Sequence, residues 1–173
     1  YVTGDSEIGG LVGYNYGLIE DCYSLSEVNG NSKVGGLVGR NTDDIKNSYS
    51  SGKTTGTSYK GGFLGDFQSG TIVNSYWDVE TSTQPELSYY TGLTGYNTAQ
   101  MIKETNSVEI YTDWNYNDTW TIIEGESYPY FIWQESENIP YPVNPFAGGK
   151  GTLSDPYQIE TAEQLNAIRN YLN

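Results

Sequence analysis

The chain of 173 residues contains no histidine and a single cysteine, Cys22. Without histidine it cannot build a Ser-His-Asp or Cys-His catalytic arrangement, or a zinc site with histidine ligands. One cysteine excludes an internal disulfide, a thiolate metal cluster and a Cys-x-x-Cys redox pair. The sequence also lacks a Gly-x-Ser-x-Gly nucleophile elbow. We therefore expect a protein that is not an enzyme and has no cofactor, in which Cys22 is a small half-buried residue or, as the alternative, an intermolecular thiol.

Basic residues are scarce, with 8 Lys and Arg against 22 Asp and Glu, so the formal net charge is −14. Nucleic-acid binding requires a basic surface, and so does attraction to anionic membranes, so both are disfavoured. No apolar run is long enough to span a membrane, and no signal peptide or initiator methionine is visible. The chain begins in mid-pattern, which suggests a processed or excised piece. The acidic charge is compatible with solubility outside a cell and with loose binding of divalent cations.

The sequence does contain a repeat, built on a glycine-rich motif that recurs every 26 residues. A fixed period in this range is typical of stacked repeat proteins. Further columns follow the motif at constant offsets, but their last step is 27, which places one inserted residue between Gly65 and Ile72. The motif and the later columns are Gly9-Gly10-Leu11-Val12-Gly13, Gly35-Gly36-Leu37-Val38-Gly39 and Gly61-Gly62-Phe63-Leu64-Gly65, followed by Ile19/Ile45/Ile72, Asp21/Asn47/Asn74 and Tyr23/Tyr49/Tyr76.

Short β-branched and aromatic runs bounded by Gly, Asn, Asp and Ser indicate strands joined by turns, and residues 1–80 show no helical periodicity. The repeat therefore predicts an all-β fold, a β-solenoid of about three 26-residue rungs. We expect Leu11, Leu37 and Phe63 to lie above one another and to point inward. Glycines are expected to supply positive φ or room for close backbone approach. The Asp21 column is expected to hydrogen-bond along the stack and the Tyr23 column to stack its rings.

These units resemble the GLUG repeat family, which occurs in secreted and cell-surface proteins of bacteria and archaea, including adhesins and some surface peptidases. The resemblance is strongest over residues 2–80. Residues 74–78, 98–101, 120–122 and 127–133 resemble the block that often closes a GLUG array. Residues 149–152, 155–159 and 162–165 resemble the segment that usually opens one. The resemblance implies a β-solenoid with a role at the cell surface, and it implies no catalytic residues.

The chain divides by composition into four parts: solenoid rungs over 1–80, a mixed capping region over 81–135, a Pro-rich linker over 136–148, and a C-terminal strand–helix element over 149–173. Residues 81–96 are predicted to be a loop. A short helix is predicted over 98–104 with Thr98 as its N-cap, one or two strands over 107–124, and an aromatic strand over 128–133. We expect the capping region to close one end of the solenoid, because an open rung is a sticky edge.

The C-terminal element predicts a contact between subunits. Its lone amphipathic helix needs an apolar surface to dock on, and the first rung is expected to have no cap of its own. Docking of the tail on the first rung of the next copy would give an open filament. Two alternatives remain: the tail begins another array in a longer protein, or it folds back on its own rungs. The contact residues expected are Tyr157, Ile159, Leu165, Ile168 and Leu172.

Three other features suggest ligands. The side chains of Asp113, Asn115, Asn117 and Glu124 follow the spacing of a calcium loop, although Asp118 stands where such a loop needs glycine. Asn117-Asp118-Thr119 is a glycosylation sequon, so Asn117 is a candidate acceptor. A set of aromatic residues is expected to form either the core of the cap or a sugar-stacking platform: Trp114, Trp120, Tyr128, Tyr130 and Trp133.

Together these features predict a non-enzymatic, extracellular structural or adhesive protein whose subunits associate head to tail through the C-terminal tail. The alternatives are a repeat fragment of a larger surface adhesin or peptidase, and a glycan-binding module that uses the aromatic residues. The expected partners are copies of the chain itself, with surface glycans or other cells as further candidates.

Overall fold

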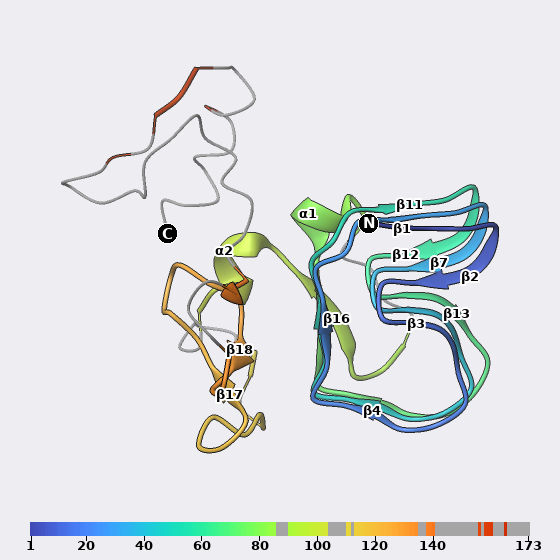
Figure 1. Ribbon diagram of the computed structural model, residues 1–173, viewed down its shortest axis with the longest axis horizontal. Helices are drawn as coiled ribbons and strands as arrows, with labels where there is room; N and C mark the ends of the chain where they lie inside the picture. The colour runs from blue at the N-terminus through green and yellow to red at the C-terminus, as the bar shows by residue number, and fades with distance from the viewer. Residues whose placement is uncertain are drawn as a thin grey trace.

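The computed structural model describes residues 1–85, 90–103, 110–111, 113–134, 138–140, 156, 158–160 and 165. Up to Asp78 the chain winds into three stacked rungs of five short strands each (Figure 1). The first rung contains β1 (Val2–Thr3), β2 (Ser6–Gly9), β3 (Val12–Asn15), β4 (Ile19–Glu20) and β5 (Tyr23–Ser24). The second contains β6 (Val28–Asn29), β7 (Ser32–Gly35), β8 (Val38–Asn41), β9 (Ile45–Lys46) and β10 (Tyr49–Ser50). The third contains β11 (Thr54–Thr55), β12 (Ser58–Gly61), β13 (Leu64–Phe67), β14 (Ile72–Val73) and β15 (Ser75–Asp78).

Equivalent strands of successive rungs pair in parallel, which confirms the predicted β-solenoid. Val12 pairs with Val38 and Val38 with Leu64, one repeat apart in each case. The Leu11 N–H donates to the Leu37 carbonyl at 3.0 Å, and the Leu37 N–H to the Phe63 carbonyl at 2.8 Å. Leu37 and Phe63 are buried as predicted, whereas Leu11, which has no rung above it, is 47% exposed.

The glycines of the motif make room rather than supply positive φ. In each rung the second glycine lies at the tip of the turn between two strands and meets a wall strand of the same rung. A Cβ on Gly36 would lie 1.9 Å from the carbonyl oxygen of Gly62, and one on Gly10 would lie 2.1 Å from Ser24 Oγ. The left-handed positions that recur from rung to rung belong instead to non-glycine residues, at Glu7, Lys33 and Tyr59, and at Asp21, Asn47 and Asn74; Gly70, in the third rung alone, also has a positive φ.

The polar ladders differ from the prediction in one respect. Side-chain amide bonds along the stack join Asn15 Nδ2 to Asn41 Oδ1 at 2.7 Å and Asn31 Nδ2 to Asp5 Oδ1 at 2.6 Å, not members of the Asp21 column. The Asp21 column forms a left-handed corner, and its ends bond to residues outside the rungs: Trp120 Nε1 donates to Asp21 Oδ1 and Asn74 Nδ2 donates to Asp113 Oδ2. The tyrosine column stacks at one step, where the rings of Tyr23 and Tyr49 lie 5.2 Å apart and nearly parallel, whereas the ring of Tyr76 contacts Tyr96, Tyr111 and Trp114.

The residues that follow the third rung cover part of it, and they pair with one of its strands, β15. Helix α1 (Val79–Ser82) leads away from β15, and β16 (Leu93–Tyr96) then returns to pair with β15 in parallel, forming the sheet β16-β15-β10-β5. The prediction of a loop over 81–96 was therefore wrong at β16. Gln84 Nε2 donates to the Thr54 carbonyl at 2.9 Å, and the ring of Tyr90 packs on Phe67.

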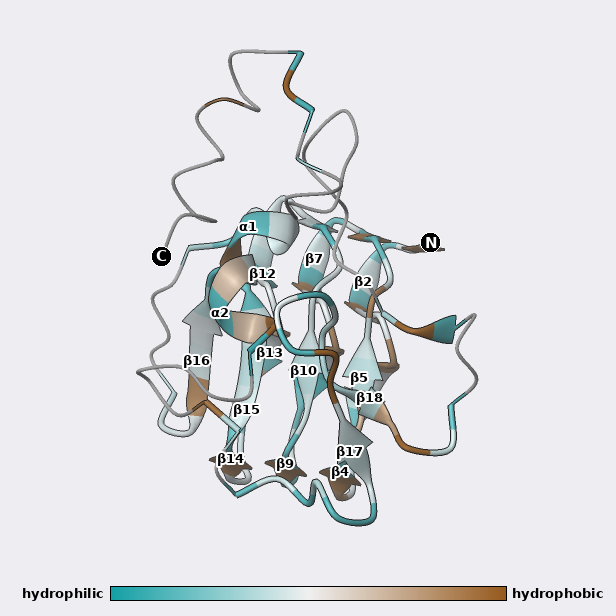
Figure 2. Cartoon of the chain, turned by 90° about the vertical axis from the view of Figure 1, so that its left-hand side faces the viewer, coloured by the Kyte–Doolittle hydropathy of each residue, from teal (hydrophilic) through white to brown (hydrophobic). Residues whose placement is uncertain are grey.

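The remaining described residues up to Gln134 lie beside the solenoid rather than over its end. Helix α2 (Thr98–Met101) and the antiparallel pair β17 (Trp120–Thr121) and β18 (Tyr130–Phe131) stand in front of the sheet β16-β15-β10-β5 (Figure 2). The N-cap of α2 is Asn97, one residue before the prediction, because Asn97 and Gln100 form a capping box. Of the strands predicted over 107–124, the described residues contain β17, and residues 113–119 form turns.

We call these residues, 97–103, 110–111 and 113–134, the lateral layer. Its core is aromatic and packs on the tyrosine column of all three rungs. Tyr49, fully buried, donates from its hydroxyl to the Pro129 carbonyl at 2.8 Å, and the Tyr76 hydroxyl donates to the Ile110 carbonyl. Burial raises the pKa of Tyr49 well above its usual value.

Candidate assembly surface at the first rung

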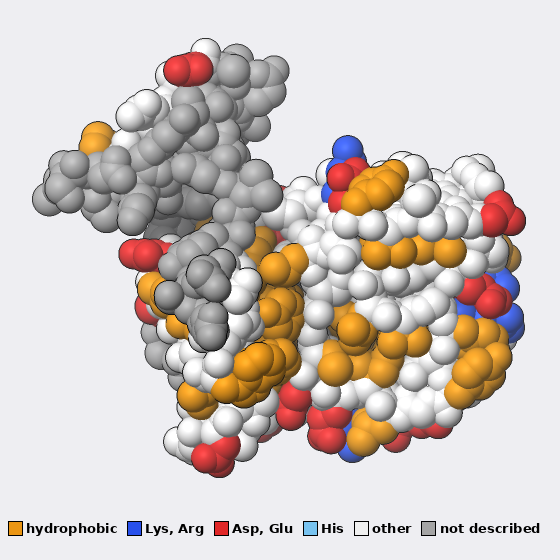
Figure 3. All heavy atoms as spheres, viewed as in Figure 1, with side chains coloured by type: hydrophobic (Ala, Val, Ile, Leu, Met, Phe, Trp, Pro, Cys, Tyr) orange, Lys and Arg blue, Asp and Glu red, His pale blue; other side chains and the backbone are white. Residues whose placement is uncertain are grey.

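The outer face of the first rung is an uncovered strand edge. Each of its five strands is the outermost strand of its sheet, so one side of every strand is left without a neighbouring strand. Figures 1 and 3 look along the stack from this end, and Figure 3 shows hydrophobic side chains in rows on it. Leu11, 47% exposed, occupies the column in which Leu37 and Phe63 are buried. Such an edge is a template for a further strand.

A cavity of about 440 Å³ opens between this rung and the lateral layer. The first rung and the lateral layer supply its apolar walls, with two amide side chains beside them. Its lining residues are Leu11, Cys22, Tyr23, Phe131, Trp133, Gln134 and Asn138.

Aromatic contacts fix the walls of this cavity. The rings of Phe131 and Tyr23 lie 5.4 Å apart, and the Tyr23 hydroxyl donates to Gln134 Oε1 at 2.7 Å. Trp133 is 77% exposed and stacks on Phe131 at 5.3 Å with an interplanar angle of 12°. Burial, and then the charge of Asp21, raises the pKa of the Cys22 thiol, which keeps it neutral. The cavity is therefore apolar and uncharged, and suits an aromatic or aliphatic group.

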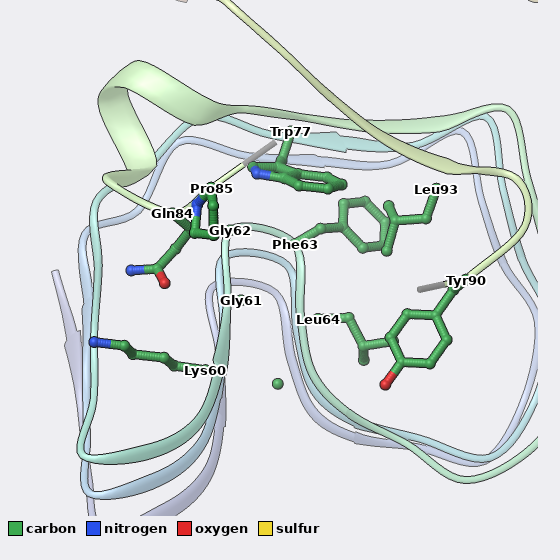
Figure 4. Close-up of a pocket in the computed structure, with 11 residues that line it drawn as sticks. Lys60, Gly61, Gly62, Phe63, Leu64, Trp77, Gln84, Pro85, Tyr90 and Leu93 are labelled. Carbon is green, nitrogen blue, oxygen red and sulfur yellow. The ribbon is translucent and has the colours of Figure 1, made fainter. Parts of the chain in front are cut away.

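The opposite end of the stack is closed in comparison. Leu93 and Tyr90 lie beside Phe63 and Leu64 of the third rung, and Gln84 lies over Lys60 (Figure 4). The cavity left there is about 200 Å³. The two ends of the solenoid therefore differ most at one sheet: β5 lacks an outer neighbour, whereas β15 is already paired with β16 and cannot accept β5 of another copy at that edge.

A buried carboxylate holds the closed end together. Asp78 is fully buried and caps α1, since its Oδ1 accepts from the N–H groups of Glu80 and Thr81. Its Oδ2 accepts from Thr98 Oγ1 and from the Tyr128 hydroxyl, each at 2.6 Å. All these contacts join elements of the fold, so we assign Asp78 a structural role. Sequence reasoning did not single it out, although an Asp between a strand and Val79-Glu80 is an N-cap signal.

Charged residues form a short ladder on the outer face of β2, β7, β8 and β13. Glu7 Oε1 accepts from Lys33 Nζ at 2.8 Å and from Arg40 Nη1 at 3.1 Å, and Arg40 also lies 3.4 Å from Asp66. The hydrogen bonds from Lys33 and Arg40 lower the pKa of Glu7. These half-buried ion pairs link adjacent rungs, and because they remain open to solvent they contribute modestly to stability.

The predicted calcium ligands use their oxygens elsewhere in this structure. Asp113 Oδ2 accepts from Asn74, and Asn115 Oδ1 accepts from the N–H groups of Asn117 and Asp118. Glu124 is exposed. Across the part of the chain that the structure describes, no group of three His, Cys, Asp or Glu side chains could hold a metal. Calcium binding stays a prediction, which a calcium titration would test.

The other predicted ligand residues are divided by the fold. Asn117, in the sequon, is exposed. Of the aromatic set, Trp114, Trp120 and Tyr128 are buried in the lateral layer, Tyr130 is half-buried and Trp133 is exposed. The set therefore makes a core with a single exposed ring at the cavity, rather than a five-ring platform.

Of the predicted contact residues in the tail, Ile159 and Leu165 are 39% and 61% exposed. Tyr157, Ile168 and Leu172 lie outside the described residues, as does most of the predicted tail and linker.

Comparison with known families identifies the repeat. The family model described as the GLUG motif matches twice in succession, at residues 4–29 and 30–55. Residues 4–55 are GLUG repeats. The first match runs from just before β2 to the end of β6, and the second from just before β7 to the end of β11, so one GLUG motif is one turn of the solenoid.

Neither a curated protein nor a solved structure gives a significant match to the chain. The strands after residue 55 keep the geometry of the GLUG repeats although neither match extends over them: Lys60 pairs with Val34 and Gly61 with Gly35. Among the described residues, no helix has the length and apolar character needed to cross a bilayer.

Proposed function

We propose that this GLUG-repeat chain is a non-enzymatic structural module of the cell exterior that assembles end to end. The C-terminal element of one copy adds a further coil to the open first rung of the next. The observation that carries this proposal is the difference between the two ends of the stack. All five strands of the first rung lack an outer neighbour and Leu11 is exposed, whereas in the third rung β16 pairs with β15, Gln84 bonds to Thr54 and Tyr90 packs on Phe67.

This difference between the two ends favours the C-terminal element as the segment that binds the first rung of the next copy. Direct stacking of β5 on β15 of another copy is obstructed by β16, which already pairs with β15. Ile159 and Leu165 are exposed in this structure, so these apolar side chains are available to a second copy. A contact between two different surfaces does not close on itself and gives a linear assembly. The net charge of −14 and the GLUG repeats support an extracellular setting.

The test compares the whole chain with a chain that ends at residue 144. We expect the whole chain to form linear particles in negative-stain images, with a mass by light scattering that rises with concentration. The shortened chain should stay monomeric. The matched variants are Leu165→Ser, which should weaken assembly, and Glu160→Gln, which should not. A whole chain that stays monomeric at all concentrations would contradict the proposal and favour a module whose first rung is covered by other coils of a longer protein.

A second candidate function is glycan binding at the cavity, favoured by the exposure of Trp133 beside Phe131. The face of an aromatic ring packs against the apolar face of a sugar. Glycan-array binding that disappears in Trp133→Ala would support it. If oligosaccharides bind without disturbing the assembly, the glycan and the C-terminal element do not share the cavity.

A further inference from the structure

We infer that the strand added to the first rung is residues 155–159 of a second copy, laid parallel to β5 with Tyr157 in the cavity beside Tyr23. This inference rests on the proposed function and names the segment and register of the contact. It aligns residue 155 with Asp21, so that the spacing Asp155-Pro156-Tyr157 repeats the spacing Asp21-Cys22-Tyr23.

The backbone pattern of the stack sets which groups of the first rung remain to be paired. The Tyr49 N–H donates to the Cys22 carbonyl at 3.1 Å and the Ser51 N–H to the Ser24 carbonyl at 3.0 Å. By the same pattern, the N–H groups of Tyr23 and Leu25 point out of the open face. In the proposed register they donate to the carbonyls of residues 156 and 158. Proline keeps its carbonyl, so Pro156 supplies the first acceptor.

The missing N–H of Pro156 matches a missing hydroxyl in the first rung. Between successive rungs, the residue before the tyrosine donates its N–H to a serine hydroxyl of the next rung. The Cys22 N–H donates to Ser48 Oγ at 3.1 Å, and the Ser48 N–H donates to Ser75 Oγ at 3.4 Å. The first rung has Cys22 at this position, and its thiol donates to the Glu20 carbonyl. A thiol is a weak acceptor. A proline above Cys22 leaves no donor unpaired, and proline is tolerated in an edge strand.

The cavity fits the next ring of the tyrosine column. Tyr23 stacks on Tyr49 at 5.2 Å with an interplanar angle of 5°. If the column is extended by one more aromatic ring at the same spacing, on the other face of Tyr23, that ring lies in the cavity lined by Leu11, Phe131 and Trp133. Tyr157 falls at this position in the register.

Two further positions agree with the register. Ile159 lies above Leu25, and both are exposed apolar side chains, at 39% and 43%. Asp155 lies above Asp21, whose φ of 51° is a left-handed conformation that Asp tolerates. The two carboxylates repel each other across the contact, so we expect assembly to tighten as ionic strength rises.

Cys22 allows a direct test of the register because it is the chain's single cysteine. In Pro156→Cys, residue 156 of one copy would lie across from Cys22 of the next, at the separation of neighbouring strands. This separation is within the Cα–Cα range of a disulfide. We expect mild oxidation, or a short bis-maleimide, to give a ladder of covalent oligomers on a non-reducing gel. The controls are Glu160→Cys, displaced along the strand, and Pro156→Cys combined with Cys22→Ser, neither of which should give the ladder. Tyr157→Ala should weaken self-association at least about tenfold.

The outcomes separate this inference from the proposed function. If linear particles form but Glu160→Cys cross-links as well as Pro156→Cys, the register is wrong although the tail still docks. If Pro156→Cys gives a cross-linked monomer, the tail folds back on its own rung, and both proposals fail. If neither particles nor cross-links form, both proposals also fail. Loss of assembly on adding an oligosaccharide that quenches Trp133, without any ladder, would assign the cavity to a glycan instead.

Discussion

At the scale of single residues, the glycine motif is explained by contact rather than by backbone conformation. The second glycine of the middle rung has the carbonyl of Gly62 so close that even a methyl group cannot be placed without moving a neighbouring rung. The turn tip therefore has to be bare for the rungs to stack at the spacing of a parallel sheet. A side chain at this position would act on two rungs at once.

We expect Gly36→Ala to destabilise the protein by about 3 kcal/mol, because its Cβ would overlap backbone rather than a flexible side chain. The matched control is Gly17→Ala, where nothing lies within 4 Å of the added Cβ and φ is not positive. There the change should be within about 0.5 kcal/mol of zero or slightly stabilising. Urea unfolding of both variants measures the difference, and equal effects would contradict the packing explanation.

Asp78 supports the closed end through four hydrogen bonds. Asp78→Ala removes the cap of α1 and leaves the hydroxyls of Thr98 and Tyr128 without their buried acceptor. We expect a loss of about 3 kcal/mol in the free energy of unfolding. Asp118→Ala, at an exposed position, is the control and should change stability by less than about 0.5 kcal/mol. A small effect of Asp78→Ala in denaturant unfolding would show that the cap and hydroxyl bonds are dispensable.

At the scale of elements, the strands of the rungs could be predicted because each column repeats in the sequence. Leu37 and Phe63, or Tyr49 and Tyr76, are equivalent residues that the period aligns without any knowledge of the fold. β16 could not be found this way. It pairs Leu93 with Ser75, a separation that is not the repeat period, and its residues do not carry the motif.

The position of the lateral layer also could not be predicted from the sequence. Its aromatic composition indicated burial, but not the surface against which the rings are buried. The structure shows that they pack on the side of the stack, where the tyrosine column offers a matching aromatic face. The open first-rung edge was expected from the sequence, whereas the cavity depends on Phe131 and Trp133 meeting Leu11, residues brought together only by the tertiary fold.

The buried tyrosines of this layer predict instability at alkaline pH. Burial raises the pKa of Tyr49, Tyr111 and Tyr128 well above the ordinary tyrosine value of about 10, whereas in the unfolded chain these groups titrate near that value. Above about pH 10 the unfolded state therefore loses protons that the folded state retains, so stability is complete below that pH and falls as pH rises. Urea midpoints between about pH 8 and 11 should show this decline, and Tyr49→Phe should reduce its slope. A midpoint that does not change over this range would contradict the prediction.

At the scale of the whole molecule, the lateral layer ties the rungs into one unit. Repeat proteins contact mainly their nearest neighbours along the stack, so that rungs can unfold one at a time. Here a single layer spans the stack: Tyr23 bonds to Gln134, Tyr49 to Pro129 and Tyr76 to Ile110. These contacts connect the first rung with the third through residues distant in the sequence.

We therefore expect solenoid and lateral layer to unfold in one transition, with coincident curves by far-UV circular dichroism and tryptophan fluorescence. Trp120 is fully buried, contacts Tyr23 and Tyr49, and donates to Asp21, so Trp120→Ala should lower the free energy of unfolding by about 4 kcal/mol. Both probes should shift together in this variant, because the rungs lose the support of the layer. Leu18→Ala, at a position 54% exposed, is the control and should leave both curves nearly unchanged. A fluorescence transition that precedes the loss of β structure would mean that the layer melts independently, and that the rungs are held by stacking alone.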